Sequence, residues 1–391
     1  MAAARPRLTT EQRRARLGVR HLLAPRHRAH DVVAVADGVV ALHATDPASV
    51  YLAAAARLRS PDAAAIASAL YDDRRLVKLL GMRRTVFTVS REVAPLVQWS
   101  SAAALQPVER RKLLADLTKE GVSGAEAWLG AAEADVVTLI RQRSSATGAE
   151  IAKAVPALRQ KLTGGLPVAA GVSTRVLFLL GVQGVLMRGR PRGTWVSSQH
   201  EWTLADEWLP GGLGELEPAV ARAELVQRWL ARFGPGTEAD LKWWTGWTFG
   251  HVRAALAAVG ALVVDLDDGT TGHVLSDDTG AVKAPAPWAA LLPALDPTAM
   301  GWQARDWYLG PHRAPLFDYS GNIGPTVWWN GRIVGGWAQT KAGAVVWRAL
   351  EDVGVDAVDL IEREVERTQQ FLGAVRVSPR FPTPLQRELT G

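Results

Sequence analysis

The chain has 391 residues, 48% of them hydrophobic and 21% charged, with a formal net charge of +6 at pH 7. This length predicts about two to four compact units, and the composition is that of a globular rather than a disordered protein. The absence of cysteine excludes disulfides, thiolate zinc sites and cysteine-ligated iron–sulfur clusters. No apolar run reaches the length of a membrane span, and residues 1–8 are too polar for a signal peptide, so we expect a cytoplasmic protein without membrane contact.

The eight histidines form no HExxH motif and no pair at helical spacing beside a carboxylate, so we expect no metal and no cofactor. Basic residues outnumber acidic ones by 45 to 39 and gather in three places. These are the first thirty residues, the pair Arg83 and Arg84, and the run from Arg188 to Arg192. Such clustering permits a polyanion partner on one face, although a solvated arginine surface explains the charge equally well.

The first hundred residues predict helices followed by a pair of short strands. Thr9 and Gln12 have the spacing of a capping box at the start of the first helix. Apolar spacing predicts helices over Leu8–Leu23, Asp31–Thr45, Ala48–Arg59 and Ala63–Leu70, and β-branched runs predict strands over Leu76–Leu80 and Thr85–Val89. Helices followed by an arginine-flanked strand pair are typical of a winged helix, in which a helix-turn-helix precedes a β-hairpin wing.

A turn separates the second and third of these helices. Pro47 lacks an N–H and biases Asp46 away from helical angles, which ends the preceding helix. His43 and Thr45 then lie two residues apart at the mouth of the turn, with Tyr51 in the first turns of the next helix. Because the pattern is also typical of an ordinary Asp-Pro turn, its functional interpretation depends on the rest of the chain.

The order of helices and hairpin recurs twice. In the second instance, helices are predicted over Gly148–Val155 and Val172–Leu180, and a hairpin over Val185–Val196. The turn of this hairpin carries Arg188, Arg190 and Arg192, which makes it a candidate to contact the DNA backbone. In the third instance, helices over Leu225–Phe233, Glu238–Thr245 and Phe249–Val259 precede an acidic hairpin around Asp268-Gly269, which suits phosphate less well.

From Ala284 onward, short β-like runs alternate with Gly, Pro and Asn turns. Asn330-Gly331 predicts a hairpin between two of these runs. One amphipathic helix follows over Val355–Phe371, and Val375–Val377 is expected to add a last strand.

These elements predict an α+β protein of three tandem winged-helix domains with a C-terminal β-barrel-like domain. We expect the units to be residues 1–100, the first winged helix with its turn, and 101–215, connecting helices with the second winged helix. Residues 216–283 are expected to form the third winged helix, and 284–391 the β-domain with its terminal helix. Because no heptad pattern predicts a dimer seam, we expect a monomer.

Three stretches resemble one protein family. They are RFGPGTEADLKWWTGW (Arg232–Trp247), LLPALDPTAMGWQARDWYL (Leu291–Leu309) and GNIGPTVWWNGRIVGGW (Gly321–Trp337). They resemble the winged-helix DNA glycosylases of the AlkZ and YcaQ type, and the similarity runs over nearly the whole chain. The resemblance implies a basic concave surface for double-stranded DNA and excision of alkylated purines in base excision repair, in some members including interstrand crosslinks. It places the protein on the nucleoid when it is bound to DNA.

The stretch Val39–Leu58 lies where this family has its catalytic turn. The resemblance implies Gln-x-Gln or Gln-x-Asp there, followed by Asp-Pro and an aromatic residue. The matching positions here are His43 and Thr45, with Asp46-Pro47 and Tyr51 kept. We therefore expect His43 to act as a water-positioning base, Thr45 as its partner and Asp46 as electrostatic support, with Tyr51 at the substrate pocket.

The expected DNA contacts lie near the predicted hairpins. They are Arg83, Arg84, Arg188, Arg190, Arg192, His312 and Arg313. The last two belong to YLGPHRAPLF, which predicts a hairpin. Two other functions remain open: a non-catalytic winged-helix DNA binder or regulator, and an interaction protein that kept the fold. Sequence-specific binding without base release would identify the first, and absence of DNA affinity at low salt would identify the second.

Overall fold

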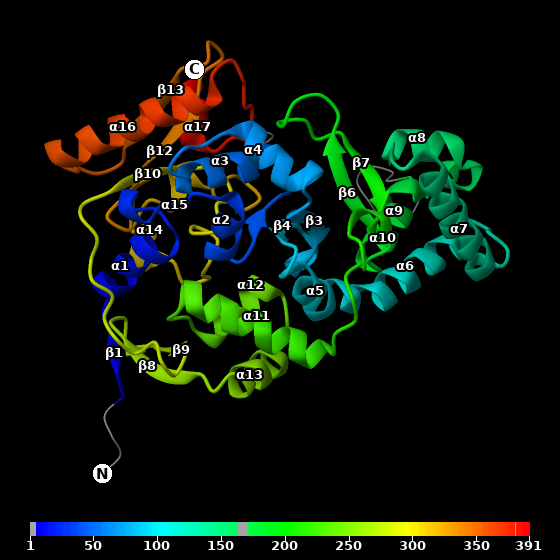
Figure 1. Ribbon diagram of the computed structural model, residues 1–391, viewed down its shortest axis with the longest axis horizontal. Helices are drawn as coiled ribbons and strands as arrows, with labels where there is room; N and C mark the ends of the chain where they lie inside the picture. Colours follow the sequence, from blue (N-terminus) through cyan, green and yellow to red (C-terminus); the bar gives the residue numbers. More distant parts are fainter. Residues whose placement is uncertain (1–4, 163–170, 380) are drawn as a thin grey trace.

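The computed structural model describes residues 5–162, 171–379 and 381–391 (Figure 1). The described residues form a mixed α+β structure with four small sheets, three of three strands and one of four. We number the sheets by their main strands: the first within residues 42–90, the second within 146–204, the third at 7–8 and 262–274, and the fourth within 289–349. The first sheet lies near the centre of the view, with the second to its right, the third below and to its left, and the fourth at the upper left. The segment that carries His43 belongs to this central sheet.

The N-terminal helices lead into the central sheet. The predicted capping box is confirmed: the Thr9 hydroxyl accepts from the Gln12 amide at 3.2 Å, and the Thr9 amide donates to the Gln12 side chain at 2.8 Å. The strands of the sheet pair in the order β2-β4-β3. The elements are α1 (Thr10–Arg20), α2 (Val32–Gly38), β2 (Leu42–His43), α3 (Pro47–Arg57), α4 (Ala63–Ala67), a π-helical turn (Ser68–Asp72), β3 (Leu76–Leu80), a 3₁₀ turn (Met82–Arg84) and β4 (Val86–Ser90).

The helix predicted over Asp31–Thr45 is wrong in its second half. It ends at Gly38, where a Cβ would lie 2.7 Å from the Leu22 Cδ1 atom, and Val40 then adopts a φ of +62°. The chain continues as β2, in which His43 pairs with Phe87 of β4. A two-residue strand has too little sequence to show period-two alternation, and its pairing partner is far along the chain. His43 therefore lies on an edge strand and not at a helix end.

The second sheet has strand order β5-β7-β6. Its elements, with the helices that precede them, are α5 (Ala94–Val97), α6 (Gln106–Lys119), α7 (Ala125–Arg143), β5 (Ala146–Thr147), α8 (Gly148–Ala154), α9 (Val172–Val182), β6 (Leu186–Pro191) and β7 (His200–Leu204). The sequence predicts that the turn of this hairpin carries Arg188, Arg190 and Arg192, which is wrong for the first two: Arg188 and Arg190 lie within β6, and residues 192–199 form the connection. Pairing of Pro191 with His200 extends the strand past the point where Gly and Pro predict a turn, with an irregularity in the register between Arg188 and Pro191.

The third sheet includes the N-terminus. β1 (Arg7–Leu8) pairs in parallel with β8, which gives the order β1-β8-β9. The other elements here are α10 (Ala205–Trp208), α11 (Pro218–Phe233), α12 (Glu238–Thr245), α13 (Phe249–Ala258), β8 (Leu262–Leu266) and β9 (Thr271–Val274). Arg16 and Arg20 of α1 both pair with Asp278, so part of the basic N-terminal run is used to attach α1 to this region.

The fourth sheet is antiparallel and open, with the order β10-β11-β12-β13. The prediction of a barrel-like closure is therefore wrong, because β10 and β13 form no strand pair with each other among the described residues. The elements are β10 (Ala289–Leu292), α14 (Asp306–Leu309), α15 (Arg313–Leu316), β11 (Thr326–Trp329), β12 (Arg332–Gln339), β13 (Val345–Ala349), α16 (Val355–Leu372) and α17 (Pro384–Thr390). The hairpin at Asn330-Gly331 is confirmed. YLGPHRAPLF forms the short helices α14 and α15 instead of a hairpin, and Val375–Val377 forms no strand.

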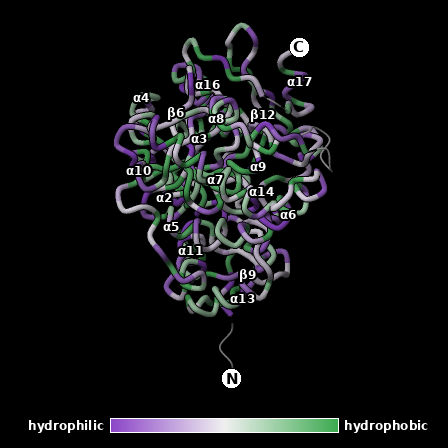
Figure 2. The backbone as a smooth tube through the Cα atoms, turned by 90° about the vertical axis from the view of Figure 1, so that its right-hand side faces the viewer, coloured by the Kyte–Doolittle hydropathy of each residue, from purple (hydrophilic) through white to green (hydrophobic). Residues whose placement is uncertain are grey.

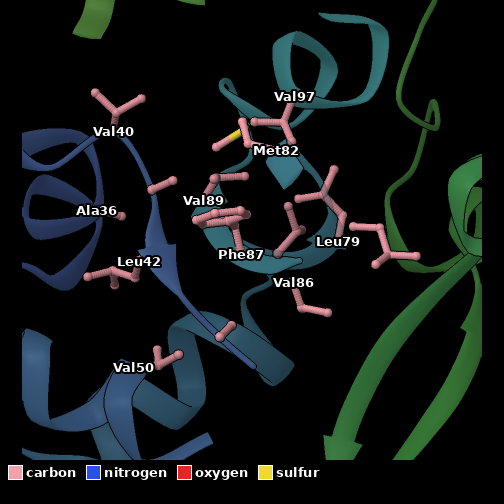
Figure 3. Packing of buried hydrophobic residues seen from close by; sticks show 14 of the residues in the cluster. Ala36, Val40, Leu42, Val50, Leu79, Met82, Val86, Phe87, Val89 and Val97 are labelled. Carbon is pink, nitrogen blue, oxygen red and sulfur yellow. The ribbon is translucent and has the colours of Figure 1, made fainter. Parts of the chain in front are cut away.

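Hydrophobic stretches gather in the interior, and hydrophilic ones follow much of the outline (Figure 2). Close to β2, side chains from α2, β2, α3 and the β3–β4 hairpin meet in one core (Figure 3). Leu42, Phe87 and Val97 belong to this core, and their burial fixes the strand that carries His43. Among the described residues, no helix combines the length and apolarity needed to cross a membrane.

A buried ion pair joins α3 to the segment after β10. The side chains of Arg57 and Asp296 are both fully buried, with two guanidinium–carboxylate contacts of 2.8 and 2.7 Å. Arg57 also donates to the carbonyl oxygens of His21 and Ala53 and to the Thr298 hydroxyl. All five guanidinium hydrogens thus have acceptors, which a buried arginine requires.

Breaking this pair should strongly destabilise the protein. Arg57→Met leaves the Asp296 carboxylate buried without its partner, and we expect the free energy of unfolding to fall by about 3–5 kcal/mol. Denaturant unfolding measures the change. Arg75→Met removes an exposed pair with Asp31, whose side chains are 48% and 45% accessible, and is the control. Its expected cost is below about 1 kcal/mol, and equal losses in the two variants would contradict the assignment.

Candidate active site

His43 is buried on the edge of the central sheet, with 6% of its surface exposed. Its ring packs edge-on against Phe87 with the centroids 5.3 Å apart, and its Nδ1 atom is buried without a hydrogen-bond partner. Burial, and then the positive charge of Arg83, lower the pKa of His43 to about 4. The imidazole is therefore neutral at physiological pH, and one of its two ring nitrogens can accept a hydrogen bond from water.

Thr45 and Asp46 follow His43 but point to different surroundings. Thr45 is exposed, so its hydroxyl is available to a ligand. The Asp46 carboxylate caps α3, accepting from the Ala48 amide at 3.0 Å and from the Ser49 hydroxyl at 3.4 Å. Burial raises the pKa of Asp46, and its side chain lines a cavity of about 200 Å³ beside Trp337. Asp46 makes no hydrogen bond to His43 in the described structure.

Tyr51 is almost fully buried, with 1% of its surface exposed. It stacks on Trp195 with the centroids 4.8 Å apart, and it shares a hydrogen bond with Tyr71. Trp195 belongs to the β6–β7 connection, so Tyr51 attaches the second sheet to α3. The structure thus surrounds Tyr51 with protein side chains, while Thr45 stays open to solvent.

Two arginines without carboxylate partners flank one indole near His43. The guanidinium of Arg83 lies 4.2 Å from the Trp243 ring centroid, and that of Arg305 lies 4.8 Å from the same ring. Neither guanidinium makes an ion pair within the described residues, and the Nε atom of Arg83 is buried without a partner. Burial, and then the charge of Arg305, lower the pKa of Arg83 to about 10, so it remains charged. Two unpaired cations held on an aromatic ring form a preorganised anion site.

The other expected DNA contacts are mostly engaged within the protein. Arg84 forms a bidentate pair with Glu109 at 2.8 and 3.0 Å. Arg190 pairs with Asp72. Arg192 pairs with Glu150 and Glu201. His312 is buried and bonded to Glu351, whereas Arg313 is exposed and stacks on Phe317. Arg188 faces a cavity on the second sheet.

Sequence reasoning missed Trp243 and Arg305. Trp243 looked like one more core tryptophan beside Trp244, which is indeed buried with 5% of its surface exposed. Trp243 points the other way on α12 and remains partly exposed. Its position against the β3–β4 turn depends on a contact across about 160 residues of chain, for which a single sequence offers no signal.

The comparisons with known proteins decide the family. The model of the family described as DNA glycosylase AlkZ-like matches residues 36–371. The chain belongs to the AlkZ-like DNA glycosylase family. It is therefore a DNA glycosylase, a DNA-binding enzyme of DNA repair, and the expectation from the sequence is confirmed.

A solved structure shares the fold. The Streptomyces sahachiroi DNA glycosylase AlkZ superposes with a TM-score of 0.74 at 22% identity, over 96% of this chain and 99% of that chain. No curated protein gives a sequence match.

The arginine pair around Trp243 should dominate DNA affinity near His43. Replacing Arg83 and Arg305 together by Gln should weaken binding to duplex DNA and lower the salt-dependence slope by about 0.9 per lost phosphate contact. Arg84→Gln, beside Arg83 but paired with Glu109, should have a smaller effect. Fluorescence anisotropy across a salt series measures both, and an unchanged slope in the double variant would remove this pair from the interface.

Proposed function

We propose that this glycosylase hydrolyses the N-glycosidic bond of alkylated purines in double-stranded DNA, using a water positioned by His43 and Thr45. The observation that carries the proposal is the burial of the neutral His43 ring beside the unpaired Arg83, in the turn that the family resemblance implies is catalytic. Bulky and crosslinked adducts belong to the same proposed substrate class. Their hydrolysis requires a water that attacks the sugar, and it does not require the whole adduct to be extruded from the duplex.

The chemistry needs little acid catalysis. An alkylated purine with a quaternary ring nitrogen is already cationic, and it leaves as a neutral base while positive charge moves to an oxocarbenium-like sugar. A base of pKa about 4 is too weak to deprotonate water fully, so His43 orients the water by accepting its hydrogen bond. The exposed Thr45 hydroxyl holds the same water from the other side.

Asp46 is proposed as electrostatic support. Its carboxylate oxygens are bonded to Ala48 and Ser49, so it acts over a distance and fixes the shape of the turn. Tyr51 supports the substrate pocket from behind through its stacking on Trp195. The negative charge of Asp46 would favour the developing cation, while its raised pKa reflects burial and makes this support sensitive to acid.

We further infer that the three small sheets belong to three winged helices. In each of the first two sheets, the strand that comes third in the chain lies in the middle and pairs with both the short first strand and the second strand. The spatial order is therefore first-third-second. In the third, the Gly236–His273 bridge takes the place of the short strand. These patterns support units at 1–100, 101–215 and 216–283, with a C-terminal β-domain at 284–391. The proposal includes a monomer that works in the cytoplasm on nucleoid DNA.

Loss of His43 should abolish base release without loss of DNA binding. For His43→Ala we expect release of N7-methylguanine from alkylated duplex to fall by at least about 100-fold. His43→Gln should keep a measurable rate, because a neutral amide oxygen can hold the same water. The exposed His27→Ala is the matched control. Equal rates in wild type and His43→Ala would exclude the proposed role, and sequence-specific binding without any release by the wild type would favour a regulator.

The pH dependence should follow the lowered pKa of His43. Since the neutral ring is the working form and its conjugate acid has a pKa of about 4, single-turnover base release should be flat from about pH 5.5 to 8 and fall as pH drops through about 4. An unperturbed histidine would instead lose activity near its ordinary pKa of about 6.5. The profile is measured on His43→Gln in parallel, which should lose the part of the acid limb that belongs to His43 and keep only the part that protonation of Asp46 contributes.

A further inference from the structure

A second cavity, whose lining does not include His43, lies between the helices and the hairpin of the second sheet. It encloses about 390 Å³, within the range of small-ligand sites. Its lining includes Thr174 and Phe178 of α9, Arg188 and Trp202 of the β6–β7 hairpin, and Leu80 of β3.

The hairpin contributes a half-buried cation that has no anionic partner within the described residues. Arg188 lies beside Trp202, with its guanidinium 5.6 Å from the ring centroid. Its Nε atom is buried without a partner, and the side chain makes no ion pair within the described residues. Burial alone lowers its pKa to about 10, with no carboxylate to oppose the shift. Its strand neighbour Arg190, by contrast, is paired with Asp72. A guanidinium desolvated without compensation is costly, which indicates an absent anionic partner.

His200 adds a hydrogen-bond acceptor to the same cavity. Its Nδ1 lies 3.2 Å from the carbonyl oxygen of Ser198, and because a carbonyl only accepts, Nδ1 carries the proton. The other nitrogen, Nε2, is buried without a partner and offers a lone pair. The ring packs edge-on against Trp202 with the centroids 5.1 Å apart. Burial, and then the charge of Arg188, lower the pKa of His200 to about 4, so the ring stays neutral.

We propose that this cavity binds one nucleotide unit, with its phosphate on Arg188, its base beside Trp202 and Phe178, and a base N–H donated to His200 Nε2. A bare phosphate would leave most of the cavity and its aromatic walls unused. A neutral aromatic ligand would leave Arg188 unpaired. Only a ligand with both an anionic group and a planar ring with N–H donors satisfies every orphan group. The inference does not depend on base excision at His43, and the nucleotide can come from a DNA strand or from free solution.

Thermal unfolding of the full chain tests the anion site. Arg188→Met removes a half-buried charge that has no anionic partner, so we expect the variant to unfold at a higher temperature than the wild type in the absence of ligand. Arg175→Met on α9 removes an arginine paired with Asp116 and should unfold at a lower temperature. The ligand is deoxyguanosine 5′-monophosphate if the site takes free nucleotides, and a short single strand if it takes a nucleotide within DNA. One of the two should raise the midpoint of the wild type and of Arg175→Met without raising that of Arg188→Met.

Calorimetric titration separates the two nucleotide sources. If the site takes free nucleotides, the monophosphate should bind Arg188→Met about 10- to 100-fold more weakly than the wild type, and deoxyguanosine without phosphate should bind the wild type correspondingly weakly. If it takes a nucleotide within DNA, the same loss should appear for a short single strand or a duplex and not for the monophosphate. Inorganic phosphate should bind more weakly than either.

Two results would overturn the proposal. One is equal affinity of the wild type for nucleoside and nucleotide, and the other is that Arg188→Met binds both DNA and the nucleotide as tightly as the wild type does. Base release by the wild type and His43→Ala is measured separately, because it tests the catalytic proposal and not the nucleotide site.

Discussion

The Arg57–Asp296 pair is the interaction on which the position of the proposed catalytic turn depends. Arg57 is the last residue of α3, and the turn with Asp46 lies at the other end of the same helix. Because both side chains are fully buried, α3 can keep its place only while the ion pair remains intact. The Ser49 hydroxyl adds a bond to the Ala294 carbonyl oxygen at 2.9 Å, so the segment after β10 contacts both ends of the helix. The N-terminal helices and the fourth sheet are thereby joined around the turn.

The arginines divide into those that complete a structure and those that lack a partner. Arg57 has five acceptors, and Arg16 and Arg20 share Asp278. Arg83 and Arg188 are also largely withdrawn from water, yet the described structure gives neither an anion. The free energy spent on desolvating an unpaired guanidinium is recovered when an anion binds. For this DNA glycosylase, the unpaired arginines are therefore better candidates for contact with phosphate than the more numerous exposed ones.

The sequence predicted features that depend on neighbours in the chain. Capping by Thr9 follows from a spacing of three residues, and the hairpin at Asn330-Gly331 follows from the turn itself. Features that depend on distant partners were not predictable in the same way. β2 exists because Leu42 and His43 pair with β4, more than forty residues later. Whether an arginine is free is likewise a property of the fold, since Arg190 meets Asp72 across 118 positions.

For the proposed reaction, burial of His43 matters more than its identity as a histidine. An alkylated purine brings its positive charge into the site, and a protonated imidazole would repel it. Burial and the nearby charge of Arg83 keep the ring neutral, so His43 presents an uncharged acceptor. In this respect it does what the carboxamide oxygen of a glutamine would do at the same position. The departure of His43 and Thr45 from the amide pair implied by the family resemblance is thus compatible with the same chemistry, provided that the core of Leu42 and Phe87 keeps the ring out of water.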